Sequence, residues 1–273
     1  MDYKTKFFVI SMLLIAILIR LPFILDKKIQ KWDECYHLLV AKNMATNQFN
    51  PSLYQKLPIE LDCKQWARNN VWLSKGPIGF IPLVIGYKIA HSNLIVMRLM
   101  TLIVVLFTLV IVYKAGQLFS QTTAFLSSLL AGINGLFMCI STARLSSDHI
   151  ETVFVFFASL FMWFLLEFSI KKNKNFLFLS ILAFGMAFLV KWIAIFLLLP
   201  SFLIVLYLSK AFKDFYVLIK YCLTCLIIFL IITLPYFLYL YLNHFDDFIC
   251  FFGRIFSPIT SVIEGHSGNF FFT

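Results

Sequence analysis

Two adjacent carboxylates, Asp33 and Glu34, follow the first long apolar run of the chain, in the segment KWDECYHLLVAKNMA (31–45). One interpretation is that they open a helix, with Asp33 as the N-cap and Glu34 in the first turn, where the helix dipole favours acidic side chains. The other is that a carboxylate at the membrane surface acts as a general base and takes a proton from an acceptor hydroxyl. The segment alone leaves both open.

Basic side chains stand near the ends of several other apolar segments. A lysine at such a position can extend its ammonium to water, and an arginine can pair with a nearby carboxylate. However, ionisable groups beside membrane spans also tend to mark functional paths. The residues concerned are Lys75 in VWLSKGPIGFIP, Arg98 in VMRLM, Arg144 with Asp148 in ARLSSDH, Lys191 in FGMAFLVKWIAIF, and Arg254, Glu264 and His266 in the last segment.

The elements that must position these residues are membrane-spanning helices. The chain is 61% hydrophobic, 18% aromatic and only 13% charged, with a mean hydropathy of +0.90, which is typical of an integral membrane protein. The formal net charge of +10 does not indicate a nucleic-acid partner. No basic stripe with interleaved aromatic residues stands apart from the membrane segments, as such a partner would require.

The apolar runs predict an all-α, polytopic fold with about seven transmembrane helices. No small-x-small cleavage site follows the first run, so we expect an uncleaved span with a cytoplasmic N-terminus. The lysine-rich segments 171–174 and 209–213 then lie inside, as the positive-inside rule requires, and 26–93, 141–147 and 243–273 lie outside. The predicted spans are 7–25, 94–113, 121–140, 148–168, 175–190, 192–208 and 215–242.

The predicted external loop, 26–93, contains two apolar segments that we interpret as helices lying in the membrane surface, 32–44 and 77–90. Three cysteines fall in external segments, where a disulfide can form, but spacing does not choose the pair. They are Cys35, Cys63 and Cys250.

In this topology every ionisable residue named above falls at the same, external membrane face. One acid with several cations at a lipid-facing surface suits a hydroxyl that attacks a sugar whose leaving group is a lipid phosphate. The cations would hold the phosphate and stabilise the charge that it gains.

The ordered motifs resemble the GT-C superfamily of polyprenyl-phosphate-sugar-dependent glycosyltransferases. The resemblance is to the type that includes protein O-mannosyltransferases, aminoarabinose transferases and lipopolysaccharide galacturonosyltransferases. The segments that carry the resemblance are WDE-x-Y-x-x-x-x-A-x-x-M at 32–44, SKGPIGFIPL at 74–83, MRLMTLIVVLFTLVIVYKAGQLF at 97–119, STARLSSDHIETVFVFF at 141–157 and FGMAFLVKWIAIF at 184–196.

The resemblance implies a role for each candidate residue. Asp33 would be the catalytic base of an inverting transfer, and Glu34 would orient Asp33 or the acceptor. The implied donor-phosphate ligands are Lys75, Arg144, Lys191 and Arg98, and the implied substrate-positioning residues are Asp148, His266 and Tyr36. Ser74 stands where some relatives have a metal-binding Glu, so we expect no metal site, and no cofactor besides the lipid-linked sugar donor.

The resemblance also implies the setting of the reaction. The chain would form a single transmembrane catalytic domain over residues 1–273 in the inner (plasma) membrane, with its site on the periplasmic or external face. The acceptor would be lipid A, a glycan or a protein hydroxyl. Relatives usually continue into further spans and a soluble domain, so we expect the chain to correspond to their N-terminal part. The alternatives are a transporter or flippase, whose charges would lie near the bilayer midplane, and an inactive fragment.

Overall fold

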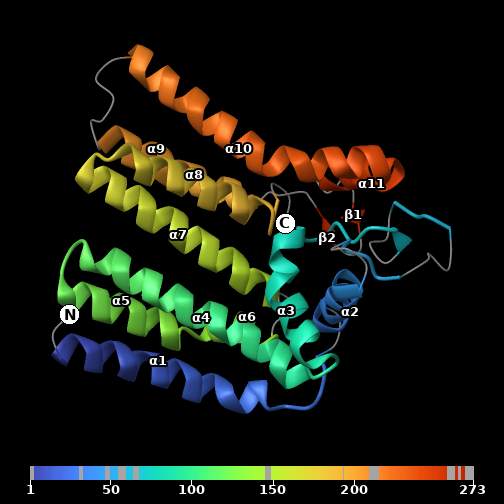
Figure 1. Cartoon of the computed structure of the whole chain (residues 1–273), viewed down its shortest axis with the longest axis horizontal. Helices are drawn as coiled ribbons and strands as arrows, with labels where there is room; N and C mark the ends of the chain where they lie inside the picture. The colour runs from blue at the N-terminus through green and yellow to red at the C-terminus, as the bar shows by residue number, and fades with distance from the viewer. Residues whose placement is uncertain are drawn as a thin grey trace.

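The computed structural model describes residues 3–30, 33–46, 50–54, 60–63, 68–144, 149–192, 194–208, 215–256, 262–263 and 266–267. Apart from two paired two-residue strands, its regular elements are helices (Figure 1). The longest are α1 (Tyr3–Ile24), α4 (Leu94–Gln117), α7 (His149–Lys171) and α10 (Phe215–Asn243). They lie side by side in a bundle with α5 (Gln121–Ile133), α8 (Lys174–Phe188) and α9 (Leu199–Leu208).

The shorter elements gather mainly at one end of the bundle, on the right in Figure 1. Both segments of the long loop that were predicted to be helical are helical, as α2 and as η2 with α3, while their position in the membrane surface stays a prediction. The shorter elements are α2 (Asp33–Thr46), η2 (Pro77–Phe80), α3 (Ile81–Ala90), α6 (Gly135–Ser141), η3 (Ala194–Leu198), α11 (Phe245–Phe256), β1 (Val262–Ile263) and β2 (His266–Ser267).

The predicted all-α fold class is confirmed, and helices occupy all seven predicted spans. By length and composition, four helices of the described chain can cross a membrane: α1, α4, α7 and most of α10. The pair α5–α6, bent by 57°, would be a fifth, while 77–90, 174–188 and 195–207 are shorter apolar helices. The count of seven spans therefore stays a prediction.

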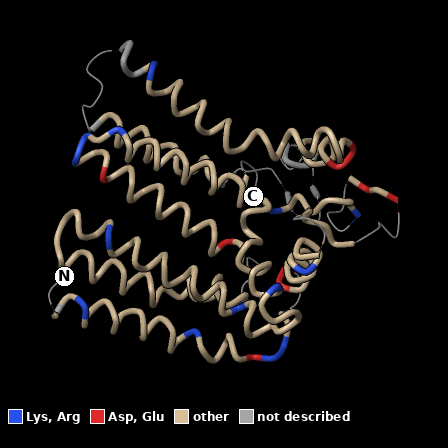
Figure 2. Tube along the Cα trace, in the orientation of Figure 1, with Lys and Arg blue, Asp and Glu red and all other residues tan. Residues whose placement is uncertain are grey.

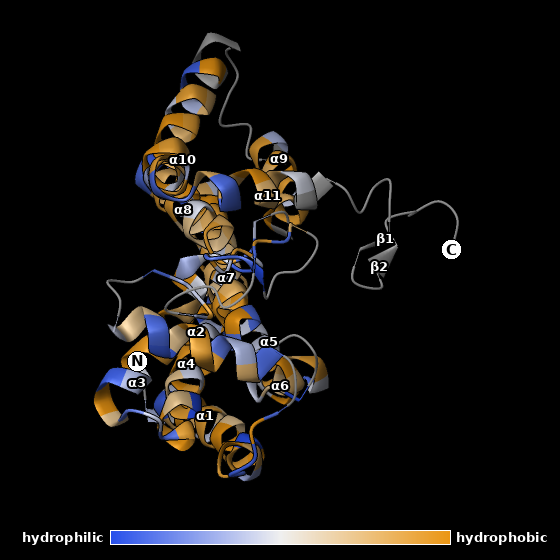
Figure 3. Ribbon diagram, turned by 90° about the vertical axis from the view of Figure 1, so that its right-hand side faces the viewer, coloured by the Kyte–Doolittle hydropathy of each residue, from blue (hydrophilic) through white to orange (hydrophobic). Residues whose placement is uncertain are grey.

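Charged and hydrophobic residues occupy different parts of the bundle. The long helices are largely hydrophobic (Figure 3), and most charged residues lie at the two bundle ends (Figure 2). Because consecutive long helices alternate in direction, the segments before α4, between α6 and α7, and after α10 all reach the same end. We call this end the site end. The lysines around the α7–α8 turn lie at the opposite end.

The bend between α5 and α6 is stabilised by a fully buried arginine that the motifs did not single out. Arg20 of α1 donates to the Gly132 carbonyl (2.8 Å), which lies at the end of α5, and to Ser141 Oγ (2.9 Å), which lies at the end of α6. Asn134 accepts from Phe137 N and so caps α6. The Gly132 carbonyl and the Phe137 N–H are backbone groups that the break leaves without an intrahelical partner, and these contacts satisfy them.

A disulfide and a pair of hydrogen bonds join the long loop to α11. Cys63 is bonded to Cys250, with their Cα atoms 4.9 Å apart, and the Asn70 backbone N–H donates to Asp247 Oδ1 (2.8 Å). Cys35 is a free, exposed thiol. The pairing that the sequence left open is therefore Cys63 with Cys250.

Peptide mapping of the purified, unreduced protein should recover Cys63 and Cys250 in one linked fragment and Cys35 as a maleimide-reactive thiol. The Cα separation of 4.9 Å lies inside the usual range for a disulfide, roughly 4.4–6.8 Å. After reduction both partner cysteines should react as well. A linked fragment that contains Cys35 would contradict this pairing.

Candidate active site

Glu34 and Arg98 form a buried ion pair at the centre of the site end. Arg98 Nε donates to Glu34 Oε1 and Arg98 Nη2 to Glu34 Oε2, both at 2.8 Å. Their side chains are 0% and 1% exposed, respectively. The geometry is a bidentate, charge-assisted contact, which is the strong form of this interaction. It ties the first turn of α2 to the first turns of α4.

The remaining N–H groups of Arg98 are also occupied. Nη1 donates to the carbonyls of Phe23 (3.2 Å) and Asp26, and Nη2 donates to the carbonyl of Lys28 (2.9 Å). A guanidinium has five N–H donors, so Arg98 has none left. The donor-phosphate role expected for Arg98 does not fit this arrangement. Arg98 instead fixes the connection from α1 to α2.

Glu34 accepts further hydrogen bonds from two directions. Its Oε2 accepts from the Gln30 backbone N–H (2.6 Å), and its Oε1 lies 3.0 Å from Nε2 of His149, at the start of α7. Burial by itself raises the pKa of Glu34, but the bonds from His149 and Arg98 outweigh it and lower the pKa to about 2. With both oxygens occupied, Glu34 does not suit contact with an acceptor. It does suit the other expected role, the orientation of Asp33.

A second group of charges, which we call the lysine–carboxylate cluster, consists of Lys75, Glu151 and Lys191. Lys75 Nζ lies 2.5 Å from Glu151 Oε1, and Lys191 Nζ lies 2.9 Å from Glu151 Oε2. The three residues come from the long loop, from α7 and from the segment after α8. Two of the predicted phosphate ligands are thus brought together, although they are far apart in the sequence.

A close backbone contact explains how the two lysines meet. Gly76 N–H donates to the Val190 carbonyl (2.9 Å), and Trp192 Nε1 donates to the Leu73 carbonyl (3.0 Å). A Cβ atom on Gly76 would lie only 1.8 Å from the Leu189 carbonyl oxygen, so the approach requires glycine. Lys75 precedes this glycine and Lys191 follows Val190, so the contact places both ammonium groups beside α7.

Asp33 is partly buried and lies within electrostatic reach of the lysine–carboxylate cluster. Burial raises the pKa of Asp33 above its ordinary value, Lys75 lowers it, and Glu151 raises it. A carboxylate with a raised pKa is a better proton acceptor than an ordinary aspartate. The next residue, Glu34, has its pKa shifted in the opposite direction.

The other predicted residues lie at varied distances from this centre. Arg144 is attached to the end of α1, because its Nη2 donates to Asp26 Oδ2 (2.7 Å) and its guanidinium lies 5.1 Å from the Phe23 ring centroid. Tyr36 packs against Trp72, with ring centroids 5.5 Å apart. Asp148 lies outside the described residues, and of His266 only the backbone, in β2, is described.

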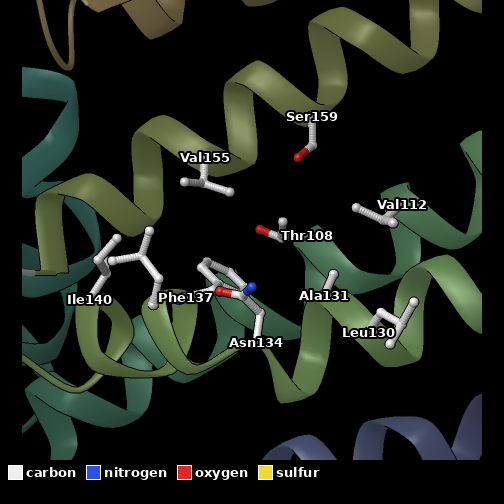
Figure 4. A pocket seen from close by; sticks show the side chains of 10 residues that line it. Thr108, Val112, Leu130, Ala131, Asn134, Phe137, Ile140, Val155 and Ser159 are labelled. Atoms are coloured by element: carbon white, nitrogen blue, oxygen red, sulfur yellow. Dashed lines mark hydrogen bonds between the residues drawn. The ribbon is translucent and has the colours of Figure 1, made fainter.

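A separate hollow of about 400 Å³ lies within the bundle, between α4, the α5–α6 bend and α7 (Figure 4). Its polar lining residues are Thr108, Asn134 and Ser159, and the others are apolar. It has no ionisable side chain among its lining residues, so it offers neither a base nor a phosphate ligand. The described ionisable residues singled out in the sequence lie at the site end and not here.

Comparison with known proteins shows which family the chain belongs to. The profile of the dolichyl-phosphate-mannose-protein mannosyltransferase family matches residues 74–239, which include Lys75, Glu151 and Lys191. The chain belongs to this family. The expected membership in the GT-C group is thereby confirmed.

Individual relatives are longer than this chain. An uncharacterized protein of Aquifex aeolicus is 30% identical over 220 residues, which cover 80% of this chain and 40% of that protein. Two crystal structures of ArnT from Cupriavidus metallidurans match, both at 17% identity. The apo structure matches with a TM-score of 0.63 over 92% of this chain and 44% of ArnT. The structure with bound undecaprenyl phosphate matches with 0.64 over 90% of this chain and 43% of ArnT. At this identity the ArnT match shows the fold.

Two residues of this family member's site end were missed from the sequence, His149 and Glu151. Both belong to the segment STARLSSDHIETVFVFF, in which the motif indicated Arg144 and Asp148. The available signal was a glutamate directly before an apolar run, since a carboxylate at the mouth of a membrane helix requires a partner. Asp26, which binds Arg144, was missed as well.

Glu34→Gln should lower the free energy of unfolding of the detergent-solubilised protein by about 3–5 kcal/mol, because it leaves Arg98 buried without a counter-charge. Chemical or thermal denaturation would measure this. Asp62→Asn is the matched control, because its pair with Arg68 is 25% and 33% exposed and should contribute no more than about 1 kcal/mol.

The stability of the parent protein and that of Glu34→Gln should depend differently on pH. The pKa of Glu34 falls from its ordinary 4.5 to about 2 on folding, so its contribution is fully present above 4.5 and is lost as the pH falls toward 2. The stability difference between the parent protein and Glu34→Gln should therefore shrink over that range. A difference that stays constant between pH 6 and pH 2 would contradict the assignment.

Proposed function

We propose that the protein is a membrane glycosyltransferase that moves a sugar from a polyprenyl-phosphate donor to a hydroxyl acceptor. The observation that carries the proposal is the convergence of Lys75 and Lys191 on one carboxylate, within electrostatic reach of Asp33. The two lysines form a phosphate-binding site, and Asp33, whose pKa is raised, is a proton acceptor beside it. Family membership and the match to ArnT with bound undecaprenyl phosphate support a lipid phosphate as the anion.

In the proposed reaction Asp33 takes the proton of the acceptor hydroxyl as its oxygen attacks the anomeric carbon. The bond from that carbon to the phosphate oxygen breaks, and its electron pair leaves with the phosphate. Attack opposite the leaving group inverts the anomeric configuration. Lys75 and Lys191 stabilise the charge that the phosphate gains, which is the electrostatic part of catalysis. The proposal uses no metal or further cofactor.

The remaining candidates take supporting roles in this proposal. Arg144 is partly exposed and is anchored by Asp26, so it is placed to contact the donor or acceptor headgroup from the α1 side. Glu34 and Arg98 hold the first turn of α2 and thereby Asp33. Asp148, Tyr36 and His266 stay candidates for contacts with the sugar or the acceptor, and the acceptor class is lipid A, a glycan or a protein.

We further propose that the site end faces the periplasm or the cell exterior. The Cys63–Cys250 disulfide supports this, because disulfides persist in oxidising compartments. Lys171, Lys172 and Lys174 stand at the opposite end, as expected of a cytoplasmic loop.

Asp33→Asn should lower sugar transfer by roughly 10²–10⁴-fold, because the amide cannot accept the acceptor's proton. Binding of the donor lipid should persist, since the lysine–carboxylate cluster is intact. Transfer is measured with radiolabelled donor in membranes and binding with purified protein. Asp62→Asn, a loop carboxylate at the same end, serves as the control. Near-normal transfer by Asp33→Asn would show that another group is the base.

A membrane-impermeant maleimide applied to intact cells should modify Cys35, which is exposed at the site end. In a Cys35→Ser background, a cysteine introduced by Lys174→Cys should react only after permeabilisation, because the α7–α8 turn lies at the opposite end. Labelling of the Lys174→Cys protein from outside would reverse the proposed orientation.

A further inference from the structure

We propose that Glu151 sets the charge of the phosphate site, so that the site favours the singly charged phosphodiester of the donor over the doubly charged phosphomonoester of the product. This inference rests on the proposed function. It concerns a residue to which neither the motif resemblance nor the family match gives a role. Glu151 acts here through the two lysines as a positioning and selectivity residue.

The geometry gives Glu151 a central place between the lysines. Each of its two oxygens binds one ammonium group, at 2.5 Å for Lys75 and at 2.9 Å for Lys191. Its side chain is 8% exposed, against 17% for Lys75 and 39% for Lys191. The carboxylate is therefore the innermost group, and the lysines are the groups that an incoming anion can reach.

The cluster can hold an anion while Glu151 remains in place. An ammonium group has three N–H donors, and Glu151 accepts one from each lysine. Within the described part of the chain these are the hydrogen bonds that the two ammonium groups make, and their other donors can reach phosphate oxygens. Two ammonium charges and one carboxylate give the cluster a net charge of +1.

The reaction changes the charge of the group bound there. A phosphodiester, as in a polyprenyl-phosphate sugar, carries one negative charge. The polyprenyl monophosphate left after transfer has a second ionisation near pKa 6 and carries about two negative charges at neutral pH. Asp33 is unchanged in every protein compared below, so the charge of the cluster decides the comparison. A cluster charge of +1 suits the singly charged substrate, and the Glu151 carboxylate repels the additional charge of the product. Without Glu151 the site would have a charge of +2 and would retain the product.

A purely structural role for Glu151 predicts a different result. If Glu151 only held the two lysines together, its loss would weaken every phosphate ligand alike. The charge hypothesis predicts a change in the ratio of two affinities. The probes are a polyprenyl monophosphate and its methyl phosphodiester, which share the lipid chain and differ by one ionisable oxygen.

Dissociation constants of both lipids are measured near pH 8 with the purified full-length protein, for the parent and for Glu151→Gln. The variant should bind the monophosphate about tenfold more tightly relative to the phosphodiester, since one neighbouring charge commonly shifts an ionisation by 1–3 pKa units, or tenfold per unit. Inhibition of transfer by the monophosphate should strengthen in parallel. Glu167→Gln is the matched control, because Glu167 pairs with Lys171 at 2.5 Å near the other end of the same helix. It should leave the ratio unchanged.

A second variant changes the charge in the opposite direction. Lys191→Gln should weaken binding of the monophosphate more than binding of the phosphodiester. It keeps the test decisive if Glu151→Gln does not fold. An unchanged affinity ratio in either variant, or equal weakening of both lipids, overturns the inference. If the parent protein binds neither lipid, the donor assignment fails and the inference fails with it. If the ratio stays constant while Asp33→Asn still abolishes transfer, only the inference fails.

Discussion

The buried pair of Glu34 and Arg98 is the interaction on which the rest of the site end depends. Taking two charges out of water is costly, and the cost is offset only when geometry is good and the remaining polar groups are satisfied. Here the arginine uses all its donors on Glu34 and on three carbonyls in the last turn of α1 and the segment after it. Glu34 also accepts from Gln30 and contacts His149. The pair therefore positions the ends of α1, α2, α4 and α7 together.

Helix α7 connects the Glu34–Arg98 pair to the lysine–carboxylate cluster. His149 and Glu151 are two residues apart on α7, so their side chains leave the helix about 200° apart at 100° per residue. His149 contacts Glu34, and Glu151 contacts the two lysines. The start of α7 thus lies between the Glu34–Arg98 pair and the lysine–carboxylate cluster. A shift of α7 would change both groups. The first turn of α7 can be buried although it is polar, because His149 and Glu151 have hydrogen-bonding partners there.

Hydropathy and loop charge were sufficient to predict the helices and the gathering of ionisable residues at one end, because both follow from the free energy of burying polar groups in a bilayer. The partners were not predictable in the same way. Arg98 was expected at the donor phosphate because the sequence alone does not show which cations are already paired. Its acceptors include backbone carbonyls, which no sequence motif identifies. Glu151 was overlooked because its importance comes from Lys75 and Lys191. These meet it only through a backbone contact at Gly76 that leaves no room for a side chain.

The two adjacent carboxylates of the first motif occupy environments that separate their chemistry. Glu34 faces the bundle, where Arg98 and His149 hold its pKa at about 2, and it stays ionised as an anchor. Asp33 is one residue away on the same helix turn, but burial and Glu151 raise its pKa, against the lowering effect of Lys75. Neighbouring acids with pKa values shifted apart are a recurrent way to assign different tasks to similar groups. A single carboxylate could not serve both purposes, because the hydrogen bonds that fix an anchor also remove its basicity. The helix therefore pairs one fixed acid, Glu34, with the acid that we propose accepts a proton, Asp33.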